Sequence, residues 1–279
     1  MSGLLGAAEI REIAERIGVR PTKKLGQNFV VDANTCRKIV KSAGVISEDV
    51  VLEIGPGLGS LTLAALEVAD KVVAIEIDSR LAAELPMTAE RHGFDPSKLT
   101  ILCEDAMGVC ALPFDPTVLV ANLPYNISVP VLLRFLELFP TLGSGVVMVQ
   151  SEVADRLVAK PNNKTYGSPS VKAAWWAELS SAGTVSRSIF WPVPNVDSSL
   201  VRFVRHPSAG NEELRKSTFK IIDAAFAQRR KMMRAALSTL CGGSAQASEI
   251  IETSGIDPTI RGEALELSDF IKIAITLSK

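Results

Sequence analysis

The sequence predicts an α/β protein with a doubly wound, mostly parallel sheet, an antiparallel strand near the end of that sheet, and a small C-terminal α-helical domain. Short apolar runs rich in β-branched residues alternate with helical patterns between residues 50 and 150, and this alternation is typical of parallel sheets with helical crossovers. Only helical patterns follow residue 211. Hydrophobic residues make up 47% of the 279 residues, which is enough for a sizeable core.

The first half of the chain contains five candidate strands. Residues 8–17 predict a short amphipathic helix that ends at Gly18, and Asp32 is expected to cap a helix over 33–43. The expected strands are Val50–Ile54, Lys71–Ile77, Leu99–Cys103, Val118–Ala121 and Gly145–Gln150. Helices are expected between them at Leu61–Val68, 79–90 and 129–139.

The pattern changes after Ser151. A helix over 151–159 is expected to lead into a loop at 161–170, and strands near 177–188 and 199–206 flank a proline-rich turn. The last helices are expected at 212–227, 231–241, 246–253 and 268–277. The predicted domains are therefore residues 1–206, with an N-terminal helical extension, and residues 212–279, joined by a linker at 207–211.

Composition excludes several classes of protein. The first ten residues lack the basic start of a signal peptide, and no apolar run approaches the length of a membrane span. The four cysteines, Cys36, Cys103, Cys110 and Cys241, have no metal-site spacing, and the chain has only two histidines. We therefore expect a cytoplasmic protein without a metal, and nothing demands more than a monomer.

Charge is distributed unevenly along the chain. Thirty Lys and Arg residues against 31 Asp and Glu residues give a net charge of −1. The segment Arg215–Arg234, however, carries seven basic residues and a single acid, Asp223, and Lys23 and Lys24 form a second basic patch. A solvated helix face explains such a run about as well as phosphate binding does, but two patches make a phosphate-binding surface more plausible.

The strongest local pattern is the glycine-rich segment Val51–Thr62. Its glycines are spaced GxGxG and follow an acid, Glu53, whereas a dinucleotide-binding turn has the spacing GxGxxG. The GxGxG form is typical of S-adenosylmethionine binding. Glu76, at the end of the next strand, is positioned to accept hydrogen bonds from ribose hydroxyls, and Asp105, after the third strand, to accept the adenine amino group. The alternative for Asp105 is a helix N-cap.

The fourth strand leads into Asn122-Leu-Pro-Tyr. An exocyclic adenine amine is a poor nucleophile, because its lone pair is delocalised into the ring. The amide oxygen of Asn122 and a backbone carbonyl, at Leu123 or Pro124, can accept its two N–H bonds and direct the lone pair at a methyl group. Tyr125 offers a face for an extruded base, and Phe190 or its neighbour Trp191 is a candidate for the other side.

Six segments together resemble the bacterial small-subunit rRNA adenine dimethyltransferases of the KsgA/RsmA type. They are Lys23–Val30, Glu53–Thr62, Asn122–Ser128, Gln150–Leu157, Phe190–Ser198 and Phe226–Met233. The resemblance implies a Rossmann-like methyltransferase sheet, the cofactor S-adenosylmethionine, and N6 dimethylation of two adjacent adenosines near the 3′ end of 16S rRNA within an immature small subunit.

The resemblance also implies roles for individual residues. The cofactor residues would be Asn28, Val30, Gly55, Glu76, Asp105 and Asn122. The catalytic residues would be Asn122, Leu123, Pro124 and Tyr125 at the amine, with Phe190 stacked on the base. The segment from Phe226 would lie at the start of the RNA-binding helical domain. The charge distribution, in turn, makes Arg215–Arg234 and Lys23 and Lys24 the expected phosphate contacts.

Three other functions compete with this interpretation. An Erm-type 23S rRNA methyltransferase has the same chemistry on another RNA, but the segments Asn122–Ile127 and Gln150–Leu157 favour the small-subunit family. A non-catalytic ribosome assembly factor with a relict methyltransferase fold would not need Glu76 and the intact Asn122–Tyr125 segment. A DNA adenine methyltransferase shares the tetrapeptide but not the basic helical tail.

Overall fold

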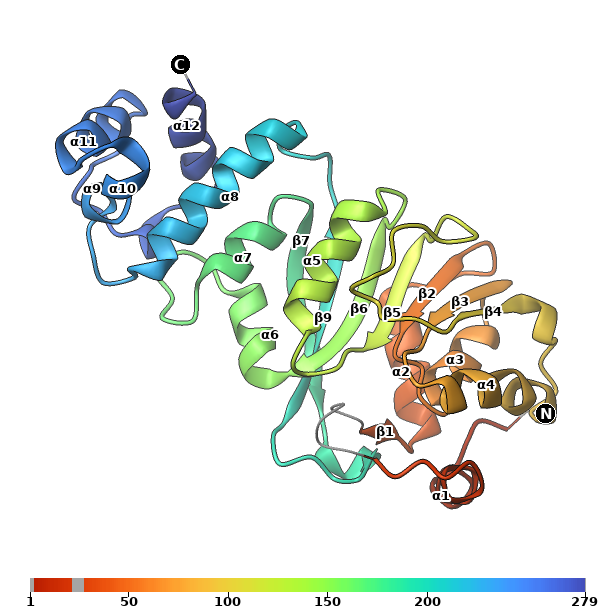
Figure 1. Cartoon of the computed structure of the whole chain (residues 1–279). Helices are drawn as coiled ribbons and strands as arrows, with labels where there is room; N and C mark the ends of the chain where they lie inside the picture. Colours follow the sequence, from red (N-terminus) through yellow and green to blue (C-terminus); the bar gives the residue numbers. More distant parts are fainter. Residues whose placement is uncertain (1–2, 22–27, 279) are drawn as a thin grey trace. The chain divides into compact units, whose positions relative to one another are not determined.

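The computed structural model describes residues 3–21 and 28–278. Contacts divide the chain into two compact units. Unit 1 comprises Met1–Ala154 and Ser180–Arg205, and it contains most of the sheet. Unit 2 comprises Asp155–Leu179 and His206–Lys279, and it contains the C-terminal helices (Figure 1).

The main sheet has seven strands in the order β4-β3-β2-β5-β6-β9-β7 (Figure 1). They are β2 (Val50–Ile54), β3 (Lys71–Ile75), β4 (Leu99–Leu102), β5 (Val118–Asn122), β6 (Ser144–Gln150), β7 (Ala177–Val185) and β9 (Ser198–Arg205). The first five strands in that order are parallel, and β9 runs antiparallel to β6. The predicted fold class, a mostly parallel sheet with an antiparallel strand near its end, is confirmed.

Helices precede, connect and follow the parallel strands. Before β2 come α1 (Ala7–Arg16) and α2 (Ala33–Ala43). Between parallel strands, α3 (Ser60–Leu66) follows β2, α4 (Ser79–Arg91) follows β3 and α5 (Ser128–Leu138) follows β5, and α6 (Ser151–Val158) comes after β6. Asp32 caps α2 as expected, because its Oδ1 accepts a hydrogen bond from the backbone N–H of Thr35 at 2.6 Å. Gly44 ends the same helix with φ of 77°, a conformation that favours glycine.

The strand order reverses between β2 and β5, which are neighbours in the sheet but not in the sequence. The chain proceeds outward from β2 through β3 to β4, and then returns to place β5 and β6 on the other side. The crevice at the carboxyl ends of the strands at such a reversal is where open α/β sheets bind ligands. The segments that follow β2, β3, β4 and β5 therefore converge on one candidate site.

A two-stranded ribbon joins segments that lie 160 residues apart in the sequence. β1 (Phe29–Val30) pairs antiparallel with β8 (Phe190–Trp191), and Phe29 lies opposite Trp191. Neither strand was expected from the sequence, because two residues are too few to show a periodic pattern. The ribbon brings the Lys23–Val30 and Phe190–Ser198 segments together at their described residues.

Unit 2 has its own hydrophobic core. Its helices are α7 (Ser168–Ala173), α8 (Glu212–Ala227), α9 (Met233–Ala236), α10 (Ser238–Cys241), α11 (Ser244–Thr253) and α12 (Leu267–Leu277). Tyr166 and Val171 lie in this core beside Ile222 and Phe270, and the Tyr166 hydroxyl donates to the carbonyl of Leu265 at 2.8 Å. This packing places residues 155–179 in unit 2, although the sequence assigned them to the 1–206 domain. The division into a catalytic and an RNA-binding domain stays a prediction.

Two local predictions were wrong. The expected loop at 161–170 contains the beginning of α7, where Pro169 occupies the first turn and the Ser170 hydroxyl accepts from the Gly167 N–H at 3.1 Å. The expected helix over 231–241 consists of the short helices α9 and α10. Backbone hydrogen bonds from Met233 and Arg234 to carbonyls of residues 258–260 fix the start of α9 against a distant segment.

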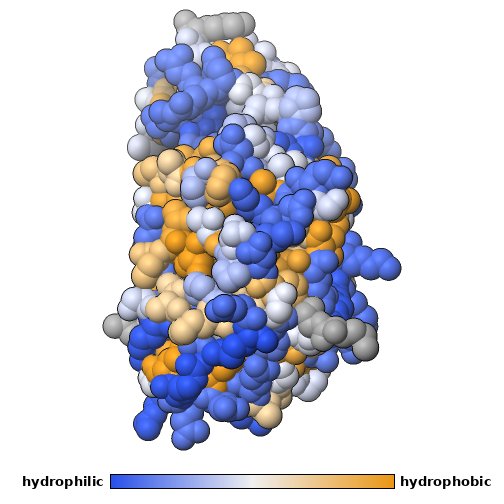
Figure 2. Space-filling model, turned by 90° about the vertical axis from the view of Figure 1, so that its right-hand side faces the viewer, coloured by the Kyte–Doolittle hydropathy of each residue, from blue (hydrophilic) through white to orange (hydrophobic). Residues whose placement is uncertain are grey.

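On the face shown in Figure 2, hydrophobic residues lie in several groups separated by hydrophilic ones. Among the described residues, no helix combines the length and the apolar composition needed to cross a bilayer.

Candidate functional site

The glycine turn between β2 and α3 forms the floor of the site. Gly57 and Gly59 have φ of 59° and 100°, which L side chains rarely adopt. The N–H of Gly55 donates to the carbonyl of Ile75 at 2.9 Å, so the turn is anchored to β3. A Cβ on Gly55 would lie 3.8 Å from Cδ of Pro124 and 3.9 Å from the carbonyl oxygen of Asn122. The glycine turn and the Asn122-Leu-Pro-Tyr segment are therefore close together.

Glu76 follows β3 directly and holds this turn in place. Its side chain is buried, with Oε2 accepting from the N–H of Gly57 at 3.1 Å and Oε1 accepting from the N–H of Asp78 at 3.0 Å. Burial raises the pKa of the carboxyl, and the two backbone hydrogen bonds oppose that rise. The carboxylate thus links the end of β3 to the glycine turn after β2.

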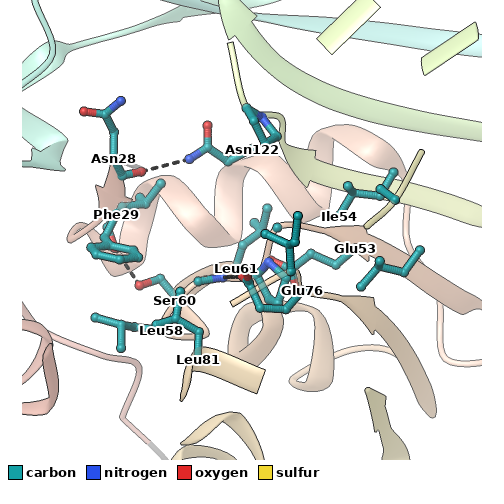
Figure 3. A pocket seen from close by; sticks show the side chains of 18 of the residues that line it. Asn28, Phe29, Glu53, Ile54, Leu58, Ser60, Leu61, Glu76, Leu81 and Asn122 are labelled. Carbon is teal, nitrogen blue, oxygen red and sulfur yellow. Dashed lines mark hydrogen bonds between the residues drawn. The ribbon is translucent and has the colours of Figure 1, made fainter. Parts of the chain in front are cut away.

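One pocket contains all six residues expected to bind the cofactor (Figure 3). We call it the switch-point pocket, because it lies where the strand order of the sheet reverses. Its lining residues are Asn28, Phe29, Val30, Glu53, Ile54, Gly55, Pro56, Gly57, Leu58, Ser60, Leu61, Ile75, Glu76, Ile77, Leu81, Glu104, Asp105, Ala106, Asn122, Pro124 and Ile127. Of the five residues expected at the amine, only Asn122 and Pro124 are among them. Leu123, Tyr125 and Phe190 lie outside the lining.

Sequence reasoning missed several lining residues. Phe29 is buried in β1, and the Ser60 hydroxyl donates to the carbonyl of Val30 at 2.6 Å (Figure 3). This bond attaches the start of α3 to β1 and so to the wall of the pocket. Both residues belong to segments that the sequence had singled out, Lys23–Val30 and Glu53–Thr62, but neither was named as a site residue.

Asn122 ends β5 with its amide oriented by a single hydrogen bond. Its Nδ2 donates to the carbonyl of Asn28 at 3.0 Å (Figure 3), and no described donor reaches Oδ1. Among the neighbouring carbonyls, that of Pro124 accepts the N–H of Ile127 at 3.1 Å, whereas that of Leu123 accepts nothing from the described residues. The oxygens left available are Oδ1 of Asn122 and the carbonyl of Leu123.

The three candidate stacking rings have different surroundings. Tyr125 is half-buried, with its hydroxyl 2.8 Å from the Ser198 hydroxyl. Phe190 is 2% exposed and belongs to the core of unit 1. Trp191 is half-buried and stacks on Phe29, with ring centroids 6.1 Å apart. Since Phe29 lines the pocket, Trp191 packs against a residue of the pocket wall.

Asp105 lies in the loop after β4 and is exposed. Its Oδ1 accepts from the N–H of Met107 at 2.9 Å, so the side chain caps a turn as well as lining the pocket. Within the described part of the chain, no group of three or more His, Cys, Asp or Glu side chains could hold a metal ion.

We expect Gly57→Ala to weaken cofactor binding at least tenfold and to destabilise unit 1. The left-handed conformation costs a non-glycine residue about 1–2 kcal/mol, and the new Cβ would lie 2.8 Å from the Phe29 ring in the pocket wall. The measurements are titration with S-adenosylmethionine and thermal unfolding. Gly44→Ala is the control, because Gly44 has φ of 77° but nothing within 4 Å of an added Cβ. Equal cofactor affinity in the two variants would contradict the expectation.

The fold and the site define a Rossmann-like, S-adenosylmethionine-dependent methyltransferase. The pocket at the strand reversal is lined by residues of the GxGxG turn, by acids after β3 and β4, and by Asn122 and Pro124 of the Asn-Leu-Pro-Tyr segment at the end of β5. Residues 19–279 match the family model described as "Ribosomal RNA adenine dimethylase". The chain belongs to this family of methyltransferases, and its cofactor is S-adenosylmethionine.

Curated relatives resemble the chain over nearly its full length. It is 58% identical to the "Ribosomal RNA small subunit methyltransferase A" of Leifsonia xyli subsp. xyli, over 97% of this chain and 98% of that protein. It is 55% identical to the protein of the same name from Streptomyces griseus, over 97% of this chain and 94% of the relative.

Solved structures share the fold. A dimethyladenosine transferase from Plasmodium falciparum superposes with a TM-score of 0.76 at 26% identity, covering 88% of this chain and 95% of that chain. The 23S rRNA methyltransferase ErmE superposes with a TM-score of 0.67 over 90% of this chain and 100% of its own, but at 22% identity this likeness shows the fold alone.

Proposed function

We propose that the protein transfers methyl groups from S-adenosylmethionine to the N6 amino groups of two adjacent adenosines near the 3′ end of 16S rRNA, in an immature small subunit. The observation that carries the proposal is a pair of oxygens at the end of β5 that accept no hydrogen bond from the described residues. They are Oδ1 of Asn122, which lines the switch-point pocket, and the carbonyl oxygen of the next residue, Leu123. The relatives named small-subunit methyltransferases support the choice of RNA. The proposal includes a cytoplasmic location and action as a monomer.

The pocket residues fit S-adenosylmethionine. Glu76 is positioned to accept hydrogen bonds from ribose hydroxyls, Asp105 to accept the adenine amino group, and the Asn28–Val30 backbone to contact the cofactor. The absence of a Cβ at Gly55 permits close approach to the backbone. When bound, the cofactor supplies an electrophilic methyl group on a cationic sulfonium.

The acceptor pair prepares the amine for attack. If Oδ1 of Asn122 and the carbonyl of Leu123 each accept one N–H of the adenine amine, its lone pair turns out of the ring plane. The hydrogen bond from Nδ2 to the Asn28 carbonyl holds the Asn122 oxygen in position beforehand, which is the kind of preorganisation that lowers a barrier. Tyr125 and Phe190, with Trp191 as the alternative to Phe190, are proposed to hold the extruded base by stacking.

Purified protein, S-adenosylmethionine and separate immature small and large subunits test the proposal directly. We expect dimethylated adenosine near the 3′ end of 16S rRNA and none in the large subunit. Methylation of the large subunit alone would instead support the Erm-type function. Binding to the small subunit without any methylation would support the assembly-factor function.

The basic segment Arg215–Arg234 is proposed to contact phosphates. Two of its residues pair with carboxylates of unit 2, Lys216 with Glu212 at 2.5 Å and Arg229 with Glu263 at 3.0 Å. Lys220, Arg230 and Lys231 are exposed and form no ion pair with any carboxylate in the described residues. The other proposed contacts, Lys23 and Lys24, lie outside the described residues.

We expect the double variant Arg230→Ala, Lys231→Ala to bind rRNA more weakly and with less dependence on salt. Each lost phosphate contact lowers the slope of log K against log salt by about 1, so the slope should fall by about 2. The measurement is RNA affinity at several salt concentrations. The control is Lys38→Ala, Lys41→Ala, which removes two exposed lysines of α2. An unchanged slope in the first variant would mean that the two residues are only a solvated surface.

A further inference from the structure

The lining of the switch-point pocket is rich in carboxyl groups. Four carboxyl groups line it, those of Glu53, Glu76, Glu104 and Asp105. Among the described lining residues there is no Lys, Arg or His to balance them. Glu104 and Asp105 are exposed, whereas Glu53 and Glu76 are 2% and 5% exposed. The two buried carboxyls therefore depend on the ligand for a positive charge.

Glu53 is the less satisfied of the two. Its Oε2 accepts a hydrogen bond from the Thr62 hydroxyl at 2.6 Å, and no donor in the described residues reaches Oε1. The two oxygens of Glu76, in contrast, each accept a backbone N–H. Figure 3 shows Glu53 and Glu76 among the side chains around the pocket. A carboxyl group that is 2% exposed and accepts a single side-chain hydrogen bond is costly to ionise unless a cation lies near it.

The groups that face Glu53 favour its protonated form while the pocket is empty. The pKa of Glu53 is raised to about 8. Burial is the largest cause, the hydrogen bond from Thr62 on α3 opposes the rise, and the charge of Glu76, which follows β3, adds to it. Cys36, on α2, is the other titratable neighbour, and burial raises the pKa of its thiol to about 12. The thiol is thus neutral at physiological pH, and no described neighbour supplies a positive charge to Glu53.

We propose that Glu53 is a specificity residue that distinguishes S-adenosylmethionine from its demethylated product by charge, losing a proton to solvent when the cationic cofactor binds and regaining one after methyl transfer. The inference rests on S-adenosylmethionine being the cofactor. The cofactor has a sulfonium, and so carries one positive charge more than S-adenosylhomocysteine. An ionised carboxylate is stabilised by that charge, whereas the neutral thioether leaves the protonated carboxyl as the stable form. Product release is thereby favoured.

The predicted pH dependence follows from these signs. Below a pH of about 8, Glu53 must lose a proton before its carboxylate can attract the sulfonium. The affinity of the protein for the cofactor should therefore rise with pH between 6 and 8 and then level off. The affinity for S-adenosylhomocysteine should not show this rise with pH, because the thioether carries no charge. The ratio of the two affinities should therefore rise by up to about tenfold per pH unit below the plateau.

Calorimetric titration of the whole protein at pH 7, in two buffers of different ionisation enthalpy, counts the protons released. Both ligands have an amino group that can itself exchange a proton on binding. The quantity compared is therefore the number of protons released by wild type minus the number released by Glu53→Gln. With S-adenosylmethionine we expect wild type to release about one proton more than the variant, and with S-adenosylhomocysteine no difference. The variant should also lose most of the preference for the cofactor, about tenfold. Glu104→Gln, at an exposed position of the same lining, is the control for proton release.

If Glu53→Gln does not fold, a second variant still tests the inference. Thr62→Val removes the hydroxyl that stabilises ionised Glu53, so the pH at which the affinity levels off should move upward. Equal proton release by wild type and Glu53→Gln, or an unshifted pH profile in Thr62→Val, would overturn the inference. Cofactor binding without excess proton release contradicts only this inference, whereas failure of wild type to bind S-adenosylmethionine at all would contradict the proposed function.

Discussion

Glu76→Ala is expected to weaken S-adenosylmethionine binding by more than 100-fold. The substitution removes the carboxylate proposed to hold the ribose, and it leaves the N–H groups of Gly57 and Asp78 without their present acceptors. Hydrogen bonds to a charged group contribute about 1.5–3 kcal/mol each, and 1.4 kcal/mol corresponds to tenfold in affinity. Titration with the cofactor measures the effect, and Glu76→Gln, which retains one acceptor oxygen, should lie between wild type and Glu76→Ala.

The control for Glu76 is another buried glutamate of unit 1. Glu84 is 1% exposed and pairs with Arg16 and Arg91, each at 2.6 Å, outside the pocket lining. Glu84→Gln should lower the unfolding temperature while leaving cofactor affinity within a few-fold of wild type. If Glu76→Ala and Glu84→Gln weakened cofactor binding equally, the loss in Glu76→Ala would reflect lower stability of the protein and not a lost contact with the cofactor.

The part of the fold that positions the pocket was predictable from the sequence because each element carries a local signal. The runs at Val50–Ile54 and Lys71–Ile75 are apolar and rich in β-branched residues, as strands buried on both faces require. Asp32 and Gly44 mark both ends of α2. Because parallel strands place their carboxyl ends at one edge, Gly55, Glu76 and Asp105 could be expected in one site before any contact was known.

The contacts that complete the site depend on distant segments, and for that reason the sequence did not reveal them. Ser60 binds the Val30 carbonyl across 30 residues, and Asn122 binds the Asn28 carbonyl across 94. The β1–β8 ribbon joins two-residue strands that have no periodicity to detect. The same ribbon buries Phe190 and leaves Trp191 against Phe29, a difference in burial between adjacent aromatic residues that no local pattern encodes.

The second unit illustrates how packing overrides local signals. Pro169 and the polar residues around it indicated a loop, yet proline suits the first turn of a helix, where its missing N–H costs nothing. Tyr166 lies in the same stretch and is buried against Phe226, with ring centroids 5.9 Å apart. The ring partner of Tyr166, Phe226, and the carbonyl that its hydroxyl donates to, at Leu265, belong to distant parts of the sequence, so the boundary of the compact unit could not be placed from composition alone.

Asn122→Ala is expected to reduce kcat for methyl transfer by about 10³, because one preorganised hydrogen-bonding group at a reacting centre contributes about 10²–10³ and the Asn28 contact that orders the segment is lost as well. Affinity for the RNA should stay near that of wild type, since the proposed phosphate contacts lie on other residues. Asn122→Asp keeps an acceptor oxygen but loses the donor to the Asn28 carbonyl, so partial activity is expected.

Single-turnover methylation with saturating cofactor separates the chemical step at Asn122 from binding. RNA binding is measured in parallel, and Asn34→Ala, at an exposed position of α2 outside the pocket lining, is the matched control. Full methylation by Asn122→Ala would refute the assignment of the amine acceptor. A loss of RNA binding equal to the loss of rate would instead place Asn122 in substrate binding. A large loss of rate with intact binding is the result expected of an acceptor for the adenine amine.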